Sequence, residues 1–323
     1  MPSRLIEIHT DTTGHKLKLI ATDSDQPKPY ATSSYCWGGN QPLQSAKALV
    51  HLWMTDIPWQ RLPKTLQDAI TVCSPLGIFS LWVDCFCIIQ DDETDKAIQI
   101  ARMPDIYQSS ALTIAAVCAA SVLDGFLDER RATNVLEQAF ELPVVCHNGE
   151  MGSITLIKAI NYHKPEPLDL RGWTLQERLL STRILEFGRK TISWTCKSGK
   201  QVLSDAWNDK LVDGNYQLDK LHKQFDKLSA VRRRDGREHF QTAMRYWNDL
   251  LEVYTKRKLS VPTDRIMAIS GIAQRYGAAC GGEYLAGLWK DALPNALLWG
   301  REGEMRSRPE QWQGPSWSWT SIN

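Results

Sequence analysis

A long apolar run with a single aspartate inside it decides the fold that the sequence predicts. The run reads Ile78-Phe79-Ser80-Leu81-Trp82-Val83-Asp84-Cys85-Phe86-Cys87-Ile88-Ile89. Its length and its aliphatic and aromatic content predict a buried strand over residues 78–89, of the kind found in parallel sheets. A carboxylate inside such a run raises the free energy of folding unless it has partners or lies where the strand ends. We therefore expect Asp84 to be partnered, or to line a cleft at the C-terminal end of the strand.

The segments around this run alternate between strand and helix signals. Strands are predicted over residues 30–35 and 111–120. One helix is predicted to begin at Pro63, and a second is predicted from residue 91 to about residue 107. The order strand, helix, strand, helix, strand is typical of an α/β fold, a parallel sheet flanked by helices with right-handed crossovers.

Further parts are expected at both ends of this core. The first 21 residues predict a hairpin, and residues 121–170 form a less regular insertion. From about residue 205 the pattern becomes mainly helical, with Asp264 as the expected cap of one helix. The predicted organisation is a core over residues 1–204 that carries the hairpin and the insertion, with a helical part over residues 205–323 packed on it.

Composition excludes several classes of function. The chain has 323 residues and a net charge of +1, so no overall field draws it to nucleic acid or to an anionic membrane. Its longest apolar run, residues 112–123, is too short to cross a bilayer, and residues 1–4 do not begin a signal peptide. The eight cysteines are scattered and predict no disulfide framework. We expect no membrane span, no nucleic-acid partner and a cytoplasmic location.

Residues 171–181 predict a helix with an unusual glutamate. On a helix, Glu177 lies one turn beyond Trp173 and beside the apolar stripe that Leu180 continues. A carboxylate pressed against an indole is partly desolvated, which raises its pKa and suits it to chemistry. The alternative is a glutamate on the helix surface, paired with Arg178 or Arg183.

Other chemistries have little support. Cys85 and Cys87 lack the second pair of ligands that a zinc site needs, so no metal is expected. No histidine forms a motif with a cysteine, which a cysteine nucleophile would require. The sequence contains no phosphate-binding Walker loop, no nucleophile elbow and no dinucleotide-binding glycine motif.

Three long motifs follow one another along the chain. The first is Tyr35-Cys36-Trp37-Gly38, the second extends from Leu62 to Asp92, and the third is Arg171-Gly172-Trp173-Thr174-Leu175-Gln176-Glu177-Arg178-Leu179-Leu180-Ser181. Together they resemble the signature blocks of the fungal heterokaryon-incompatibility (HET) domain, over residues 30–196. The departures are Cys85-Phe86 in place of a commoner Ser-Leu, Thr195 in place of Glu, and Pro104 within a helix that is normally unbroken. The resemblance implies a part in fungal non-self recognition and programmed cell death.

HET domains in turn resemble TIR domains, which have a flavodoxin-like sheet. In TIR domains that cleave NAD, a helix with the pattern Trp-Cys-Leu-x-Glu-Leu carries the catalytic glutamate. The stretch Trp173-Thr174-Leu175-Gln176-Glu177-Arg178 is similar to this pattern and places Glu177 on the catalytic position. This likeness implies that NAD or NADP is a substrate, and no cofactor is expected.

The same resemblance implies a substrate site at the ends of the strands. Aromatic rings would stack on the substrate, the glycine loop would approach a phosphate, and Arg171 would either pair with a phosphate or lock Asp84 or Glu177 in place. The expected substrate-binding residues are Tyr35, Cys36, Trp37, Gly38, Asp84, Arg171 and Trp173.

Three functions remain open from the sequence. The first is a TIR-like glycohydrolase that depletes NAD or NADP. The second is a death-signalling module that works by self-association or by binding a signalling protein. The third is an enzyme that uses the same cleft on another small metabolite.

Overall fold

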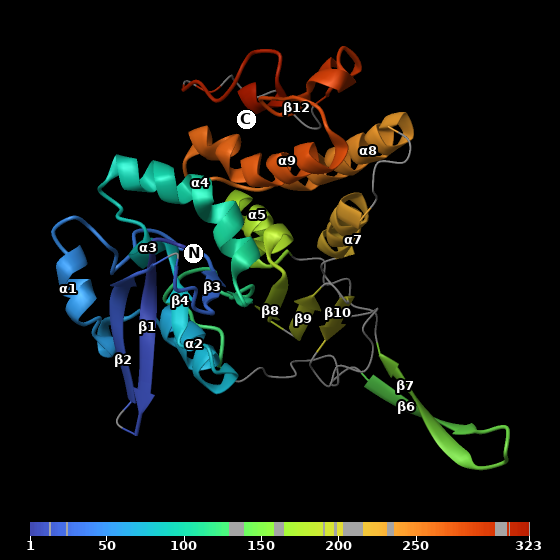
Figure 1. The fold of residues 1–323 in the computed structure, drawn as a ribbon. Coiled ribbons are helices and arrows are strands. Elements are labelled where there is room, and N and C mark those ends of the chain that lie inside the picture. Colours follow the sequence, from blue (N-terminus) through green and yellow to red (C-terminus); the bar gives the residue numbers. More distant parts are fainter. Residues whose placement is uncertain are drawn as a thin grey trace.

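The computed structural model describes residues 1–12, 14–23, 25–128, 139–157, 165–189, 191–196, 199–202, 216–230, 236–300, 309 and 311–322. Its centre is an eight-stranded sheet with the order β10-β9-β8-β5-β3-β4-β1-β2 (Figure 1). The strands are β1 (Arg4–Asp11), β2 (Gly14–Ala21), β3 (Ala31–Ser34), β4 (Ser80–Trp82), β5 (Leu112–Ala115), β8 (Arg183–Phe187), β9 (Ile192–Cys196) and β10 (Gly199–Val202).

The sheet is mixed, and only its middle is parallel. Strand β3 pairs in parallel with β4 and β5, and β5 pairs in parallel with β8. In chain order these four strands lie as 2-1-3-4, which matches the first four places of the flavodoxin-like order. The α/β prediction is therefore confirmed. The hairpin predicted for the first 21 residues is also found, as β1 and β2, and it pairs antiparallel with β4 at one side of the parallel strands. At the other side a short connection joins β8 to β9 as an antiparallel hairpin, so the sheet is parallel only from β4 to β8.

Helices cover both faces of the parallel strands. Helix α2 (Lys64–Cys73) lies on one face, whereas α4 (Glu93–Ser109) and α5 (Gly172–Leu180) lie together on the other (Figure 1). This division follows from right-handed crossovers, because the chain moves from β3 to β4 in one direction and from β4 to β5 in the other. Shorter helices are α1 (Val50–Thr55), α3 (Asp84–Cys87), η1 (Trp59–Arg61), η2 (Ser74–Leu76) and η4 (Pro167–Leu170).

The predicted strand over residues 78–89 is wrong in its second half. Strand β4 ends at Trp82, and Asp84–Cys87 form the single helical turn α3. The Val83 carbonyl accepts the N–H groups of Phe86 (3.1 Å) and Cys87 (2.7 Å), which closes that turn. Cys85, Phe86 and Cys87 are fully buried, so their apolar character reports burial in the core and not an extended backbone. Asp84 consequently lies just after the strand.

The C-terminal region forms a further layer on α4 and α5. It contains α7 (Tyr216–Ala230), α8 (Gly236–Thr255) and α9 (Met267–Cys280), followed by the short strands β11 (Tyr284–Leu285) and β12 (Leu288–Trp289). Short 3-10 helices are η5 (Pro262–Arg265), η6 (Lys290–Ala292), η7 (Asn295–Leu297) and η8 (Trp319–Ser321). Among the described residues, no helix is long and apolar enough to cross a membrane.

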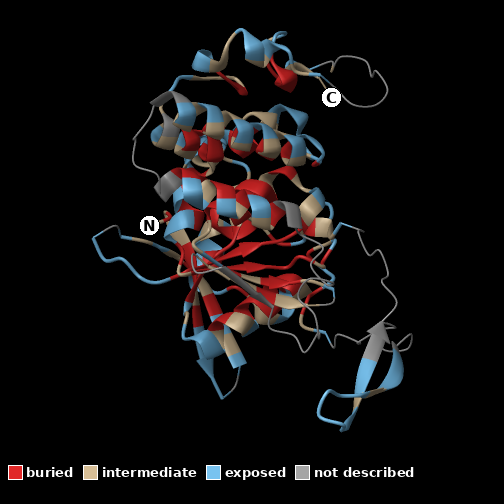
Figure 2. Cartoon of the chain, turned by 90° about the vertical axis from the view of Figure 1, so that its right-hand side faces the viewer, coloured by how far each residue is buried: buried red, intermediate tan, exposed pale blue. Residues whose placement is uncertain are grey.

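Helix α5 lies between two hydrophobic cores. One core surrounds the sheet, and the second joins α5 to the C-terminal helices through Leu175, Leu179 and Trp247. Figure 2 shows the buried sheet enclosed by helices above and below. The close fit also involves Gly271 of α9, where an added Cβ would meet Pro104 Cγ at 2.3 Å and Gln176 Oε1 at 2.7 Å.

The insertion contributes a separate antiparallel hairpin, β6 (Ala139–Val145) and β7 (Met151–Ile157). It projects from the body of the protein (Figure 1). Several apolar side chains on it are exposed, including Phe140 (69%), Val145 (66%) and Met151 (69%). Exposed apolar groups of this size are typical of surfaces that contact another molecule.

Candidate active site

The candidate site lies where β3 and β4 end, beside the point at which the strand order reverses. In open α/β sheets, ligands bind outside the carboxyl ends of the strands at such a point. Three charged residues come together here from different elements. Asp84 follows β4, Glu177 extends from α5 toward β3, and Arg171 immediately precedes α5.

Glu177 is the buried carboxylate of the site. Its side chain is 8% exposed, and its Oε2 accepts a hydrogen bond from Ser34 Oγ at 2.6 Å. Burial raises the pKa of this carboxyl to about 7, and nearby Asp84 acts in the same direction, whereas Ser34, Arg171 and Tyr107 oppose the shift. At neutral pH the carboxyl of Glu177 is therefore about half protonated, as suits a group that donates or accepts a proton.

Asp84 is half-buried and accepts three hydrogen bonds. Tyr35 donates its hydroxyl to Oδ1 at 2.8 Å, Trp37 donates Nε1–H to Oδ2 at 2.8 Å, and the Cys85 backbone N–H donates to Oδ1 at 2.7 Å. Burial raises the pKa of Asp84, although these hydrogen bonds and Arg171 oppose the shift. Asp84 therefore fixes two aromatic side chains at the end of β3.

Arg171 supplies a positive charge that acts on both carboxylates. It is partly exposed and acts electrostatically on Glu177, Asp84 and the buried Cys36 thiol. Burial raises the pKa of that thiol to about 11, and the Arg171 guanidinium opposes the shift. Within the described part of the chain, Arg171 forms no salt bridge, so its guanidinium can meet an anionic ligand.

The interpretation of Glu177 as a surface residue paired with Arg178 or Arg183 is wrong. Arg178 is fully buried and forms salt bridges with Asp169 and Glu186. Arg183 Nη1 donates instead to the Ala111 carbonyl at 3.5 Å. The neighbouring residues Glu177 and Arg178 thus have separate environments, one at the candidate site and one in a buried ionic cluster.

Two other expected site residues, Gly38 and Trp173, have contacts outside the polar network of Asp84 and Glu177. Gly38 adopts φ +72°, and a Cβ there would meet Ser121 Cβ at 2.5 Å, so backbone packing accounts for this glycine. Gly39 has φ +135° and open space beside it. Trp173 does not share the polar contacts of Tyr35 and Trp37, because its Nε1–H donates to Asp264 Oδ2 at 3.1 Å. Asp264 therefore binds an indole and is not the expected helix cap.

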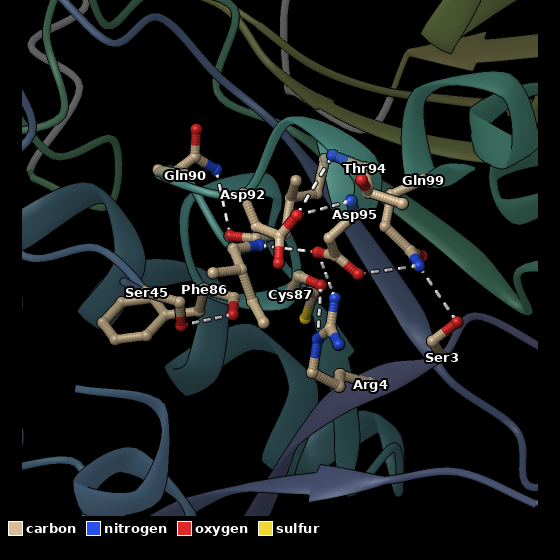
Figure 3. A network of polar contacts seen from close by, with 12 residues as sticks. Ser3, Arg4, Ser45, Phe86, Cys87, Gln90, Asp92, Thr94, Asp95 and Gln99 are labelled. Carbon is tan, nitrogen blue, oxygen red and sulfur yellow. Dashed lines mark hydrogen bonds and ion pairs between the residues drawn. The ribbon is translucent and has the colours of Figure 1, made fainter. Parts of the chain in front are cut away.

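A polar network joins helix α3, which begins at Asp84, to β1 and α4 (Figure 3). Arg4 Nε donates to the Cys87 carbonyl at 2.9 Å, and the same guanidinium forms a salt bridge with Asp95. Ser45 Oγ donates to the Phe86 carbonyl at 2.6 Å. The N-terminal hairpin and α4 thereby hold the turn that carries Asp84.

Two residues of the site were not predicted from the sequence. Ser34 ends β3 and donates to Glu177, while the Tyr107 hydroxyl donates to the Ser33 carbonyl at 3.1 Å and also interacts with Glu177. The position of Ser34 directly before the first motif is a signal that a search of strand ends would find. Tyr107 lies at the end of the helix predicted from residue 91, and the sequence gives it no role in the site.

The arrangement is suited to acid–base or electrostatic chemistry, because the buried carboxyl of Glu177 interacts with a second carboxylate and a guanidinium. Among the described residues, no group of three or more His, Cys, Asp or Glu side chains is placed to hold a metal ion.

A hollow of about 420 Å³ lies elsewhere, over α8, and is lined by Arg245, Tyr246, Asn248 and Asp249. It contains none of the expected site residues, so the converging polar contacts define the candidate site.

Comparisons with known proteins give one match. No curated protein and no solved structure matches the chain. Residues 30–177 match the family model described as heterokaryon incompatibility protein (HET), from the strand before Tyr35 to Glu177 itself. This stretch of the chain is therefore a heterokaryon incompatibility domain, and its last matched residue is the buried glutamate of the candidate site.

Proposed function

We propose that this HET domain cleaves the bond between nicotinamide and ribose in NAD or NADP. The observation that carries the proposal is the buried Glu177 carboxylate, held by Ser34 beside Asp84 and Arg171 at the ends of parallel strands. The similarity of residues 173–178 to the catalytic helix of TIR domains supports the same role. In the fungal cell, loss of NAD or NADP from the cytoplasm would cause the death response that accompanies non-self recognition.

The chemistry requires a negative charge beside the ribose. When the bond breaks, its electron pair leaves with the nicotinamide nitrogen, and positive charge develops on the ribose. The Glu177 carboxylate would stabilise that cation until water adds to the ribosyl carbon and releases a proton, as in glycoside hydrolysis. Trp37, which is partly exposed, offers an aromatic face for the base or the nicotinamide ring, and the partly exposed Arg171 offers a partner for phosphate.

The charge state of Glu177 fits a cationic ligand. With a pKa of about 7, the carboxyl is partly protonated in the empty site at neutral pH. A positively charged nicotinamide ring next to it would favour the ionised form, because an opposite charge lowers the pKa of a carboxyl. Substrate would therefore generate the charge that the reaction needs.

The second candidate function is a non-catalytic interaction module. The β6–β7 hairpin favours it, because the hairpin projects from the body and exposes Phe140, Val145 and Met151. Self-association or a signalling protein would cover that surface. In this alternative, Glu177 has no part in toxicity.

One paired experiment separates the two functions. The full chain is incubated with NAD and with NADP, and nicotinamide release is followed by chromatography. Glu177→Gln keeps the size of the side chain but removes its charge, and turnover should fall about 10²–10³-fold, the usual loss for one preorganised electrostatic partner. Glu252→Gln, an exposed glutamate paired with Lys256 on α8, is the matched control and should retain full activity.

If the purified chain releases no nicotinamide on its own, a toxicity assay in cells separates the two functions. A folded Glu177→Gln protein that remains fully toxic on expression in a fungal host would eliminate the enzyme and leave the interaction module. Loss of both toxicity and nicotinamide release, with Glu252→Gln unaffected, supports the glycohydrolase.

A further inference from the structure

The start of α5 is held by a segment that lies outside the HET match. This segment, residues 256–260, follows α8 and is called the strap here. The Gly172 N–H donates to the Lys258 carbonyl at 2.8 Å, and the Lys258 N–H donates to the Leu170 carbonyl at 2.6 Å. The strap thus pairs its backbone with residues on both sides of Arg171.

The strap also places a buried cation beneath the site. Arg257 is 8% exposed, and its Nη1 donates to the Arg171 carbonyl at 3.1 Å and to Thr174 Oγ1 at 3.2 Å. These acceptors belong to the first turn of α5. Because the backbone of Arg171 is fixed in this way, the direction in which its side chain leaves the helix is fixed as well.

Arg257 has no carboxylate partner among the residues that the structure describes. Burial, together with the nearby charge of Arg178, lowers the pKa of Arg257 to about 10, although the charges of Asp169 and Glu177 oppose the shift. A buried cation without an ion pair has a high free-energy cost, which suggests a role other than stability.

We propose that Arg257 is a positioning residue for the candidate site: it orients Arg171 through the strap and stabilises negative charge on Glu177. The inference rests on the site assigned in the proposed function, but it concerns the geometry and charge of that site and not the identity of the substrate. It makes the C-terminal region a necessary part of the site, although the HET match ends at Glu177.

Titration of Glu177 tests the proposal without needing turnover. The full chain is labelled with ¹³C at the glutamate side-chain carboxyls, and the Glu177 signal is identified by its loss in Glu177→Gln. The titratable and charged groups that interact with Glu177 are Asp84, Arg171, Tyr107, Cys36 and Arg257. Only Arg257 is changed among them, so that a shift of the midpoint can be assigned to it. Arg257→Met should move the Glu177 midpoint upward, on the order of half a pH unit, because a nearby positive charge is lost.

Two further variants separate charge from general damage. Lys256→Met removes the neighbouring cation, which is exposed and paired with Glu252, and should leave the midpoint unchanged. Arg257→Lys keeps the positive charge, so the titration midpoint of Glu177 should stay close to the wild-type value. A folded Arg257→Met protein with the wild-type midpoint overturns the proposal, whatever its melting temperature.

A milder change decides the matter if Arg257→Met does not fold. A Cβ at Gly172 would meet Leu259 Cδ2 at 2.5 Å, so Gly172→Ala displaces the strap while alanine favours the helix. The Glu177 midpoint should rise, and Leu259→Ala in the same chain should reverse the rise; an unchanged midpoint in Gly172→Ala overturns the proposal. If the wild type releases no nicotinamide, the proposed reaction fails, but this titration still gives its answer.

Discussion

The carboxyl of Glu177 should make the folded protein less stable as the pH rises from about 4.5 to about 7. In the unfolded chain the group ionises near its ordinary pKa of 4.5, whereas burial raises the pKa to about 7 in the folded protein. Between these values the folded state holds a proton that the unfolded state has lost. The contribution to stability is therefore complete below pH 4.5 and is lost as the pH rises through 7, by about 3–4 kcal/mol at most, taking about 1.4 kcal/mol per pKa unit.

Glutamine cannot ionise and should not show this loss. At pH 4.5, Glu177→Gln should be close to the wild type, because its amide oxygen can still accept from Ser34 Oγ. At pH 8 the variant should be the more stable protein, by about 2–3 kcal/mol in urea unfolding and on the order of 5 °C in melting temperature. Both are measured on the full chain at the two pH values.

Glu186→Gln is the matched control, since Glu186 is also a buried glutamate, bound to Arg178 and to Ser193 Oγ (3.0 Å). Removing its charge takes from the buried Arg178 one of two carboxylate partners, with Asp169 remaining, so this variant should lose about 1–3 kcal/mol. If Glu177→Gln instead destabilised the protein at pH 8, Glu177 would be an anchor of the fold, and the reasoning about its charge would be refuted.

Three further predictions concern stability and are measured by urea unfolding. Asp84→Asn replaces one acceptor oxygen with an amide donor that faces another donor, so it should cost about 1–3 kcal/mol. Gly38→Ala should cost at least about 1 kcal/mol more than Gly77→Ala, because both glycines have positive φ (+72° and +68°) but only the first lacks space for a Cβ. Gly271→Ala should cost about 1–3 kcal/mol by overpacking, whereas Gly277→Ala, in the same helix with its Cβ in ordinary contact, should be neutral or stabilising by up to about 1 kcal/mol. Equal stabilities within either glycine pair would contradict the packing on which these values rest.

The part of the fold that depends on local patterns was predictable. The hairpin of β1 and β2, the helices α2, α4 and α5 and the helical character of the C-terminal region follow from local sequence patterns, and the structure contains them. The mixed sheet was not predictable in the same way, because pairing between distant strands leaves no local signal. The turn α3 shows a second limit: a fully buried segment is apolar all round, so periodicity cannot separate strand from helix.

The candidate site was likewise predictable only in part: most of its residues were found from the sequence, but their contacts were not. The motifs contain Tyr35, Trp37, Asp84 and Arg171, each next to a predicted strand or helix, and Glu177, which lies within the predicted helix. The contacts among these residues depend on the fold, as does the turn of Trp173 away toward the C-terminal region. Arg257 is the clearest omission, since it lies 80 residues beyond Glu177 in a stretch with no motif, and its hydrogen bonds to the start of α5 appear only in three dimensions.

The position of α5 explains how the fold tolerates a carboxyl that lowers its stability. One side of this helix places Glu177 against β3, where the ionised group opposes folding. The other side places Leu175 and Leu179 in the second core, against the helices that follow the HET match. Burial of each such leucine contributes about 1.5–3 kcal/mol, enough to offset the carboxyl. The C-terminal helices therefore stabilise helix α5, which carries the destabilising carboxyl of Glu177. Gln176 of α5 accepts the Gly271 N–H of α9 at 2.8 Å, and this hydrogen bond fixes how the two helices are aligned.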